Sequence, residues 1–311
     1  MAERPQLNRP WLVAVWPGMG QVALNAGVYM LSKLEMDAFA ELEAGDLFDV
    51  DHIEVRNGII RPGRKPRNRF FSWKSPNGEH DLVLFLGEAQ PPLGRTPFCR
   101  HLIKFARELG VERVFTFAAM ATSMRPENPA KTFAAATDQS ILGELQRLDL
   151  EVLESGQISG LNGVLLGTAA ESGLDGACLL GEMPQVFAQL PFPKASLAVL
   201  EAFSSLAGID IDLEELSEQS RVAETQLGEL LERVEEASGR QLAGEEEQDE
   251  FIPEPPEEEP LDPADIRRIE ELFTEAATNR SKAFELKREL DRLDVFDEYE
   301  DRFLDLFKKP E

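Results

Sequence analysis

Cysteine and histidine are scarce in this 311-residue chain, which holds two cysteines and three histidines. Cys99 and Cys178 lie far apart on apolar segments, and neither a CxxC pair nor a zinc-ligand spacing is present. This pattern predicts buried free thiols, which suit a reducing cytoplasm, and no metal site. Because His52, His80 and His101 are scattered and no serine lies in a GxSxG elbow, a Ser/His/Asp hydrolase is disfavoured.

Long hydrophobic runs are also missing. No apolar segment approaches the roughly 18 residues that a membrane-spanning helix needs. The first ten residues, MAERPQLNRP, lack the hydrophobic centre of a secretory signal. We therefore expect a cytoplasmic protein that does not enter a membrane.

Basic residues are few, with 32 lysines and arginines against 58 acidic residues and a net charge of −26. Such a charge argues against non-specific binding to nucleic acid or to anionic membranes. The charge is uneven, since residues 241–311 contain 24 acidic and 10 basic side chains. This imbalance predicts that the last quarter of the chain is a separate segment.

The sequence LVAVWPGMGQVALNAG at residues 12–27 is the most informative stretch. A short apolar run ends at a turn containing Gly18 and Gly20, and an amphipathic segment follows. This pattern predicts a buried strand, a tight turn and a helix, which is the opening unit of an α/β domain. The turn leaves a helix N-terminus open to a ligand, but it does not identify that ligand.

Three interpretations of this turn are open: a dinucleotide site, another ligand site, or a structural turn. The third position of a GxGxxG pattern would be Ala23, which only the relaxed fingerprint admits. No ribose-binding acid follows a second strand, and there is no P-loop. A structural turn is the favoured interpretation, and no cofactor is predicted.

Strands and helices alternate through the first 210 residues, which predicts a mostly parallel sheet with helices on both faces. The chain then divides into an α/β core domain at 1–210, a helix that completes the core at 211–240, an acidic proline-rich linker at 241–261 and a C-terminal helix at 262–311. That last helix is too apolar to stand alone in water, so it must dock on the core, a second copy or a partner. The candidate partner-binding residues on it are Leu286, Leu290, Leu293, Phe296 and Phe303.

Two acidic residues follow predicted strands at the carboxyl edge of the sheet, where α/β proteins place ligand sites. Glu88 follows the strand at 81–87, and Glu182 follows the strand at 176–181. They could act as an acid–base pair across a cleft, although helix capping and backbone contacts are commoner uses of such carboxylates. The candidate cleft comprises Gly18, Met19, Gly20, Gln21, Glu88, Gln90, Met120 and Glu182.

The segment 61–74, RPGRKPRNRFFSWK, is basic and aromatic. Taken alone it resembles a nucleic-acid patch, which the charge of the whole chain opposes. A solvated hairpin is the simplest reading. A further hypothesis is that this segment docks the acidic linker at 245–259, within one chain or between subunits.

Five ordered blocks resemble the proteasome assembly chaperone family, in its bacterial and archaeal branch. They are PGMGQVALNAGVYMLSKL, HDLVLFLGEAQPP, FARELGVERVFTFAAMATSM, GQISGLNGVLLGTAAESGLDGACLLGEMP and GIDIDLEELSEQSRVAETQLGELL, and together they cover roughly residues 10–237. The resemblance implies a phosphorylase/hydrolase-like α/β domain that is usually oligomeric, with trimers common. It also implies a protein client, because eukaryotic and some archaeal relatives act on proteasome subunits.

One family label lacks support in this sequence, and the chain departs from the family at its C-terminal end. Some prokaryotic members are labelled ATP-grasp-like, but no ATP-grasp pattern of lysines and metal carboxylates is present here. Archaeal members that engage the proteasome ring can end in a hydrophobic residue, a tyrosine and a final residue, whereas this sequence ends FKKPE and Tyr299 is not penultimate. Direct docking of the tail into the ring is therefore not expected.

The leading interpretation is a non-catalytic, homo-oligomeric protein-binding module, with a trimer favoured. The alternative is a small-molecule-binding protein or enzyme that uses a cleft near Gly18, Glu88 and Glu182.

Overall fold

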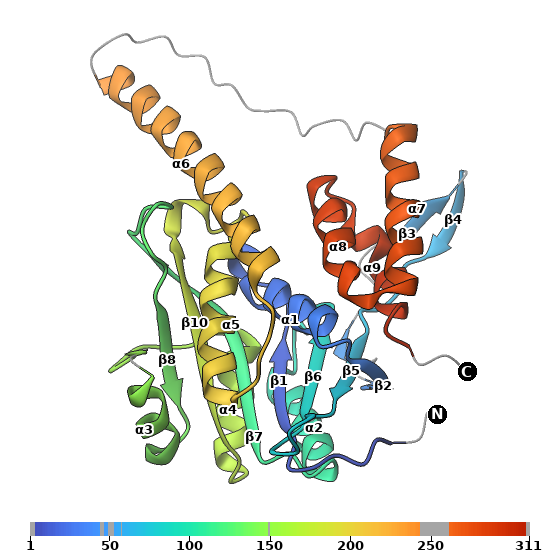
Figure 1. The fold of residues 1–311 in the computed structure, drawn as a ribbon, viewed down its shortest axis with the longest axis vertical. Helices are drawn as coiled ribbons and strands as arrows, with labels where there is room; N and C mark the ends of the chain where they lie inside the picture. Colours follow the sequence, from blue (N-terminus) through green and yellow to red (C-terminus); the bar gives the residue numbers. More distant parts are fainter. Residues whose placement is uncertain are drawn as a thin grey trace.

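The computed structural model describes residues 4–43, 47–48, 53–56, 58–148, 150–242 and 261–308. Within them an eight-stranded sheet has the order β2-β5-β6-β1-β7-β10-β8-β9, as Figure 1 shows. The four central strands β6, β1, β7 and β10 are parallel, and antiparallel pairs join β5 and β8 to them. The strands are β1 Trp11–Val15, β2 Asp37–Glu41, β5 Asn68–Trp73, β6 Leu82–Gly87, β7 Arg113–Thr122, β8 Thr132–Ala136, β9 Glu151–Val152 and β10 Asp175–Pro184.

Helices cover both faces of the sheet, as expected for buried parallel strands. One face packs against α1, α3 and α5, and the other packs against α2 and α4. The mostly parallel α/β architecture is therefore confirmed. The helices of this core are α1 Val22–Lys33, α2 Arg95–Glu108, α3 Gln139–Arg147, α4 Gly160–Glu171 and α5 Pro193–Ala207, with short 3-10 turns η1 Met19–Gln21 and η3 Gln185–Phe187.

Strand β8 has no counterpart among the strands predicted from the sequence. Its residues, TFAAA, are small and follow a proline-rich loop, so they lack the bulky β-branched run that usually marks a strand. The strand forms because β10 offers it an antiparallel edge, with Leu179 opposite Ala134. Pairing with a long neighbouring strand thus overrides a weak local preference.

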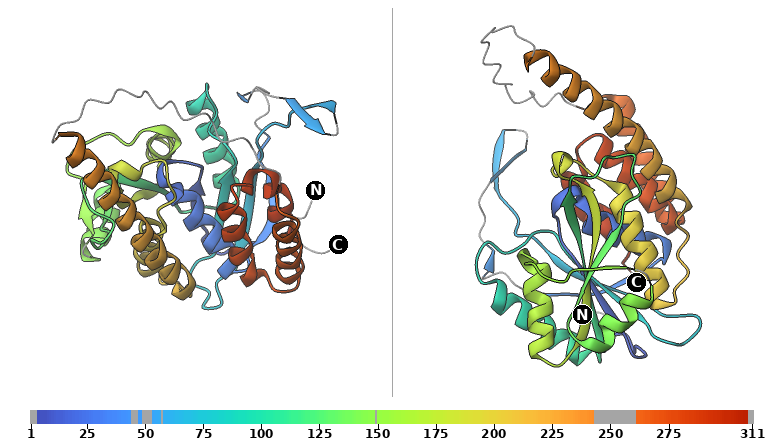
Figure 2. Two further views of the ribbon diagram at one scale, coloured as in Figure 1. Left: turned by 90° about the horizontal axis from the view of Figure 1, so that it is seen from above. Right: turned by 90° about the vertical axis from the view of Figure 1, so that its left-hand side faces the viewer.

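Helix α6, Glu214–Leu242, corresponds to the helix predicted at 211–240. Its first half packs on α5, where Leu216, Ser220 and Leu227 are buried. Its second half continues past the core, as both views in Figure 2 show. The predicted linker falls largely outside the described residues.

The single C-terminal helix predicted at 262–311 is wrong. The structure has three helices, α7 Pro263–Thr278, α8 Ala283–Arg292 and α9 Phe296–Asp305, with a 3-10 turn η4 at Arg280–Lys282. Helix α7 stops because Asn279 adopts an extended conformation and its side chain accepts a hydrogen bond from the Ser281 amide. Helix α8 stops near Asp294, which has a left-handed φ of 54°.

The three C-terminal helices pack on the core of their own chain. Helix α8 lies against α1, where Tyr29 and Phe284 form an edge-to-face pair with ring centroids 4.5 Å apart. Beyond α9, the Ala38 amide donates to the Phe307 carbonyl at 2.8 Å, so the chain end runs beside β2. This contact covers an edge strand that would otherwise expose unpaired backbone groups.

A separate two-stranded hairpin, β3 Ile53–Arg56 and β4 Ile59–Pro62, is inserted between β2 and β5. It projects from the carboxyl edge of the parallel strands, away from α7–α9 (Figure 2). None of the helices in the described ranges is both long enough and apolar enough to cross a bilayer.

Candidate functional site

The glycine turn after β1 is filled by the protein's own side chains. Gly20 has a φ of 60°, and a Cβ atom at this position would lie 2.6 Å from the Met183 sulfur. The Gly20 amide donates to the Ala188 carbonyl at 2.9 Å, and the Phe192 amide donates to the Gly20 carbonyl at 3.0 Å. Glycine is required here because only it accepts this conformation in so little space. The turn therefore joins β1 to the segment after β10.

Gln90 is also used structurally. Its amide nitrogen donates to the Pro17 carbonyl at 3.3 Å, and its amide oxygen accepts from the Leu161 amide at 3.2 Å. It therefore links the end of β1 to the start of α4. Gly18 and Gln21 flank the turn, Gly18 in an extended conformation and Gln21 with a left-handed φ of 50°.

Glu182 is held by neighbouring strands. Its carboxylate accepts from the Thr122 hydroxyl at 2.8 Å and from the Lys131 amide at 3.2 Å. Met120 lies opposite Glu182 in the β7–β10 ladder, so the structure brings these two candidates together. Three strand spacings separate β6 from β10, which places Glu88 about 14 Å away along the sheet. The two carboxylates therefore do not form an acid–base pair.

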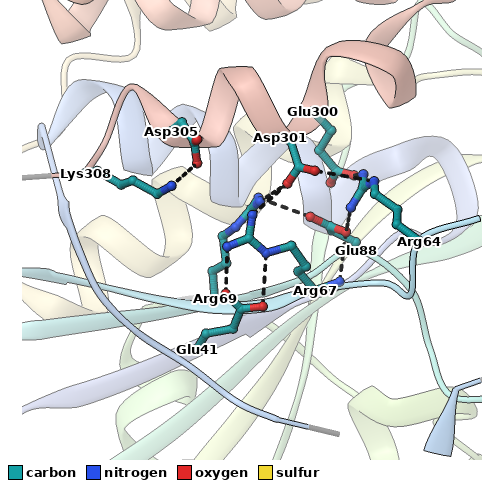
Figure 3. A network of polar contacts seen from close by, with 9 residues as sticks. All are labelled: Glu41, Arg64, Arg67, Arg69, Glu88, Glu300, Asp301, Asp305 and Lys308. Carbon is teal, nitrogen blue, oxygen red and sulfur yellow. Dashed lines mark hydrogen bonds and ion pairs between the residues drawn. The ribbon is translucent and has the colours of Figure 1, made fainter. Parts of the chain in front are cut away.

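Glu88 is the centre of an ion-pair network, drawn in Figure 3. Its carboxylate contacts Arg64 at 2.6 Å and Arg69 at 3.1 Å, and it accepts from the Arg67 amide at 2.8 Å. The side chains of Glu88 and Arg69 are only 4% and 5% exposed. Because these donors already occupy its oxygens, the carboxylate is poorly placed to take a proton from a substrate.

The same arginines reach two further elements. Arg67 pairs with Glu41 on β2 at 2.7 Å and with Asp301 on α9 at 2.9 Å, and Arg69 also contacts Asp301. Burial alone would raise the pKa of Asp301, but the three arginines together lower that pKa below its ordinary value. The network thus fastens α9 to the sheet.

Sequence reasoning missed this role of the basic segment. Its arginines bind acidic side chains of β2, α9 and the end of β6. Positions 64–69 are therefore part of an ion-pair network and not of the solvated hairpin that was the simplest interpretation of the sequence. The acidic linker at 245–259 lies outside the described residues, so its docking stays a prediction. The run of arginines was the available signal, but the acids that they bind are distant in the sequence. Glu88 is 24 positions from Arg64, and Glu41 and Asp301 are 26 and 234 positions from Arg67.

Four cavities bordered by described residues lie away from the candidate cleft. One of 630 Å³ opens at the amino edge of the sheet, beside Trp11, His80 and Arg113. Burial is the largest cause that lowers the pKa of His80, whose ring stacks on Trp11 at 4.0 Å. Others of 800, 430 and 390 Å³ border β9, α5 and α2. No residue of the predicted cleft lines any of these four cavities.

Apolar side chains are exposed at the carboxyl edge instead. Met19 follows β1, Leu93 follows β6, and Val186 and Leu190 follow β10, with exposed fractions of 44, 79, 70 and 40%. The hydrogen bonds of Gly20 and Gln90 described above tie these three segments together. We call this set the carboxyl rim. Exposed apolar groups gathered at one edge are typical of a protein-binding surface.

The residues predicted to bind a partner from the C-terminal segment are turned inward. Leu286, Leu290 and Phe303 are fully buried, Phe296 is 8% exposed, and Leu293 is half-buried against the core. A partner could reach them only by displacing the helices. In the part of the chain that the structure describes, no group of three or more His, Cys, Asp or Glu side chains is placed to hold a metal ion.

Comparison with known proteins agrees with this geometry. The family model described as the PAC2 family matches residues 12–231. That range contains the eight-stranded sheet, apart from Trp11 at the start of β1, and the first part of α6.

Solved structures with the same fold cover most of the chain. A Pyrococcus furiosus protein described as PbaB, an archaeal proteasome activator, is 28% identical, covers 75% of this chain and 96% of its own, and has a TM-score of 0.63. A PAC2 family protein from Streptomyces avermitilis is 26% identical, with 71% and 95% covered and a TM-score of 0.61. Pyrococcus furiosus PbaA, described as an archaeal homolog of proteasome-assembly chaperone, is 23% identical, with 77% and 94% covered and a TM-score of 0.58.

Proposed function

This protein belongs to the PAC2 family, as the earlier resemblance indicated, and from that premise we propose that it is a non-catalytic chaperone that binds proteasome subunits. It self-associates, with a trimer as the favoured form. The carboxyl rim is its client-binding surface, and no reaction is carried out there.

One observation carries the proposal, and it concerns the carboxyl edge of the sheet, where α/β enzymes hold their substrates. The glycine turn at this edge is filled by side chains and the charge of Glu88 is paired, yet apolar side chains are exposed there. Met183 occupies the space over the glycine turn, and Glu88 is bound by three arginines. Val186 and Leu93, by contrast, are more than two-thirds exposed. A surface of this kind suits another protein better than a small molecule.

Two relatives support the choice of client. The similar archaeal proteins are described as a proteasome activator and as a homolog of a proteasome-assembly chaperone. Their likeness covers 75% and 77% of this chain. The buried free thiols Cys99 and Cys178, whose pKa burial raises to about 12, support a cytoplasmic location.

The test is direct binding to the proteasome α and β subunits of the same organism, measured by biolayer interferometry. The protein should bind at least one of these subunits. Val186→Asp should weaken that binding tenfold or more, because it places a charge in an apolar contact. Val222→Asp is the matched control, since Val222 is an exposed valine on α6, 48% exposed and outside the rim.

Two results would contradict the proposal. One is a wild-type protein that binds neither type of subunit. The other is a Val186→Asp variant that binds as tightly as the Val222→Asp control.

A further inference from the structure

The second half of α2 carries three basic side chains along one side of the helix. Arg100, Lys104 and Arg107 follow one another at spacings of four and three residues, which makes them neighbours on a helix surface. All three side chains are exposed. We call them the basic stripe of α2, and they form it in a chain whose net charge is −26.

These cations are not neutralised by the acids around them. Among the described residues, no carboxylate forms an ion pair with any of the three. The one acidic side chain of the helix, Glu108, is paired with Arg4 at 3.1 Å. Like charges four residues apart on a helix repel each other, so an anion bound between them would relieve this repulsion.

The basic stripe borders a cavity of 390 Å³. The cavity is lined by Arg100, Ile103, Lys104, Arg107, Glu108 and Ser172. Arg107 also donates a hydrogen bond to the Ser172 carbonyl at the end of α4, which holds its guanidinium at the border of the cavity. The cations therefore surround a hollow, where one small anion can touch more than one of them.

This cavity is separate from the carboxyl rim. Helix α2 connects β6 to β7, and both strands run parallel to β1, so the helix leads from the carboxyl edge of the sheet back to its amino edge. Leu93 of the rim precedes the first residue of α2, whereas Arg107 lies in its last turn. The basic stripe is therefore a second surface, distinct from the one proposed for the client.

The stripe suits a chain of phosphate groups. Guanidinium groups present parallel N–H donors that bind two phosphate oxygens at once. Seven residues of helix separate Arg100 from Arg107, a rise of about 10 Å, so linked phosphates reach more of the stripe than a single phosphate does. At physiological salt the repulsion from distant acidic residues is screened beyond about 8 Å, which leaves the nearby cations to decide the binding.

We propose that the basic stripe of α2 binds a small molecule with two or more linked phosphate groups. The phosphate oxygens accept hydrogen bonds from Arg100, Lys104 and Arg107. Inorganic polyphosphate and nucleoside triphosphates share this chemistry. The inference goes beyond the proposed function and does not depend on the identity of the client.

The test is isothermal titration calorimetry of the full-length protein with sodium triphosphate, in a buffer of about 0.15 M salt without divalent cations. Triphosphate should bind, and its affinity should fall as the salt concentration rises. Lys104→Glu and Arg107→Glu should each weaken binding tenfold or more, because each replaces an attraction with a repulsion. Lys104 forms no ion pair or hydrogen bond between its side chain and the described residues, so a lost internal contact would not explain its effect.

Arg147→Glu is the matched control for Arg107→Glu. Arg147 is an exposed arginine at the end of α3 that has no carboxylate partner among the described residues. Like Arg107, it donates to a backbone carbonyl, that of Gly143 at 3.1 Å. Its replacement makes the same change in net charge away from the cavity, so the affinity for triphosphate should stay within twofold of the wild-type value.

A titration with adenosine triphosphate distinguishes the two sources of the phosphate chain. Tighter binding than triphosphate would assign the site to nucleotides, and equal or weaker binding would assign it to inorganic polyphosphate. Either result supports the proposal, provided that the two α2 variants lose the binding and the Arg147→Glu control keeps it.

Four results would overturn the inference. Triphosphate does not bind, or Lys104→Glu and Arg107→Glu bind it as tightly as the control does. Inorganic phosphate binds as tightly as triphosphate, which would indicate an adventitious ion only. A synthetic peptide of residues 243–260, with nine acidic and no basic side chains, binds the stripe more tightly than triphosphate, which would make it a docking site for an acidic protein segment.

Discussion

Lys287 on α8 is the most deeply buried charge that joins the C-terminal helices to the core. Its side chain is fully buried, and its ammonium group donates to the Asn25 amide oxygen at 2.9 Å and to Asp291 at 2.6 Å. It also lies 4.5 Å from the centre of the Phe296 ring. Replacing it by alanine would leave a carboxylate and an amide oxygen without their donor.

The expected loss can be estimated from these contacts. Removing one partner of a buried ion pair costs about 3–5 kcal/mol, and we expect the lower end for Lys287→Ala because Asp291 is 20% exposed. Lys287→Met removes the same donor but keeps most of the aliphatic packing, so it should destabilise the protein less than Lys287→Ala does. A domain stable by about 5–15 kcal/mol would lose a large part of its margin in the alanine variant.

The assay is denaturant unfolding combined with hydrogen exchange of the α8 and α9 amides. Lys282→Ala is the control, because Lys282 is an exposed lysine nearby that pairs with Glu285 at 3.1 Å. Faster exchange in α8 and α9 should accompany the loss of stability in Lys287→Ala. The reasoning is refuted if Lys287→Ala and Lys282→Ala unfold at the same denaturant concentration.

Three further predictions concern other parts of the molecule. Gly20→Ala should destabilise the protein by about 2–4 kcal/mol in thermal unfolding, because the methyl group meets Met183 at a left-handed φ; an unchanged melting temperature would count against a filled turn. Tyr29→Phe should cost about 1 kcal/mol in denaturant unfolding, through loss of the 2.8 Å hydrogen bond to the Asp212 carbonyl; full stability would show that this bond contributes nothing. The ion pairs that lower the pKa of Asp301 stabilise the folded state at pH values above the ordinary aspartate pKa, near 3.9, and this stabilisation is lost as the pH falls through the lower pKa of the folded state. Proteolysis of α9 in the wild-type protein should therefore increase in acid. An identical dependence of proteolysis on pH in the Asp301→Asn variant would contradict this prediction.

The parallel core could be predicted from the sequence because it follows from local pattern. The apolar run at Leu82–Gly87 and the glycine turn after β1 specify a buried strand and a strand–turn–helix unit without distant information. Strand β8 could not be predicted, since its small residues pair only because β10 is present. Local preference is weak evidence wherever a neighbour supplies the hydrogen bonds.

The candidate site was predicted less well, because its chemistry depends on long-range contacts. The position of Glu88 after β6 was readable, but its pairing with Arg64 and Arg69 was not, because these arginines also bind Asp301 and so depend on how α9 docks. The break at Asn279 had a local signal, since no large apolar residue lies between Phe273 and Phe284. That gap is too long for one continuous amphipathic helix and indicates a turn.

The most direct test of the account is native mass spectrometry of the full-length protein mixed with proteasome α and β subunits. The account predicts homo-oligomers of the protein and, in the same spectrum, complexes in which they carry proteasome subunits. A spectrum that contains only monomers and free subunits would contradict it.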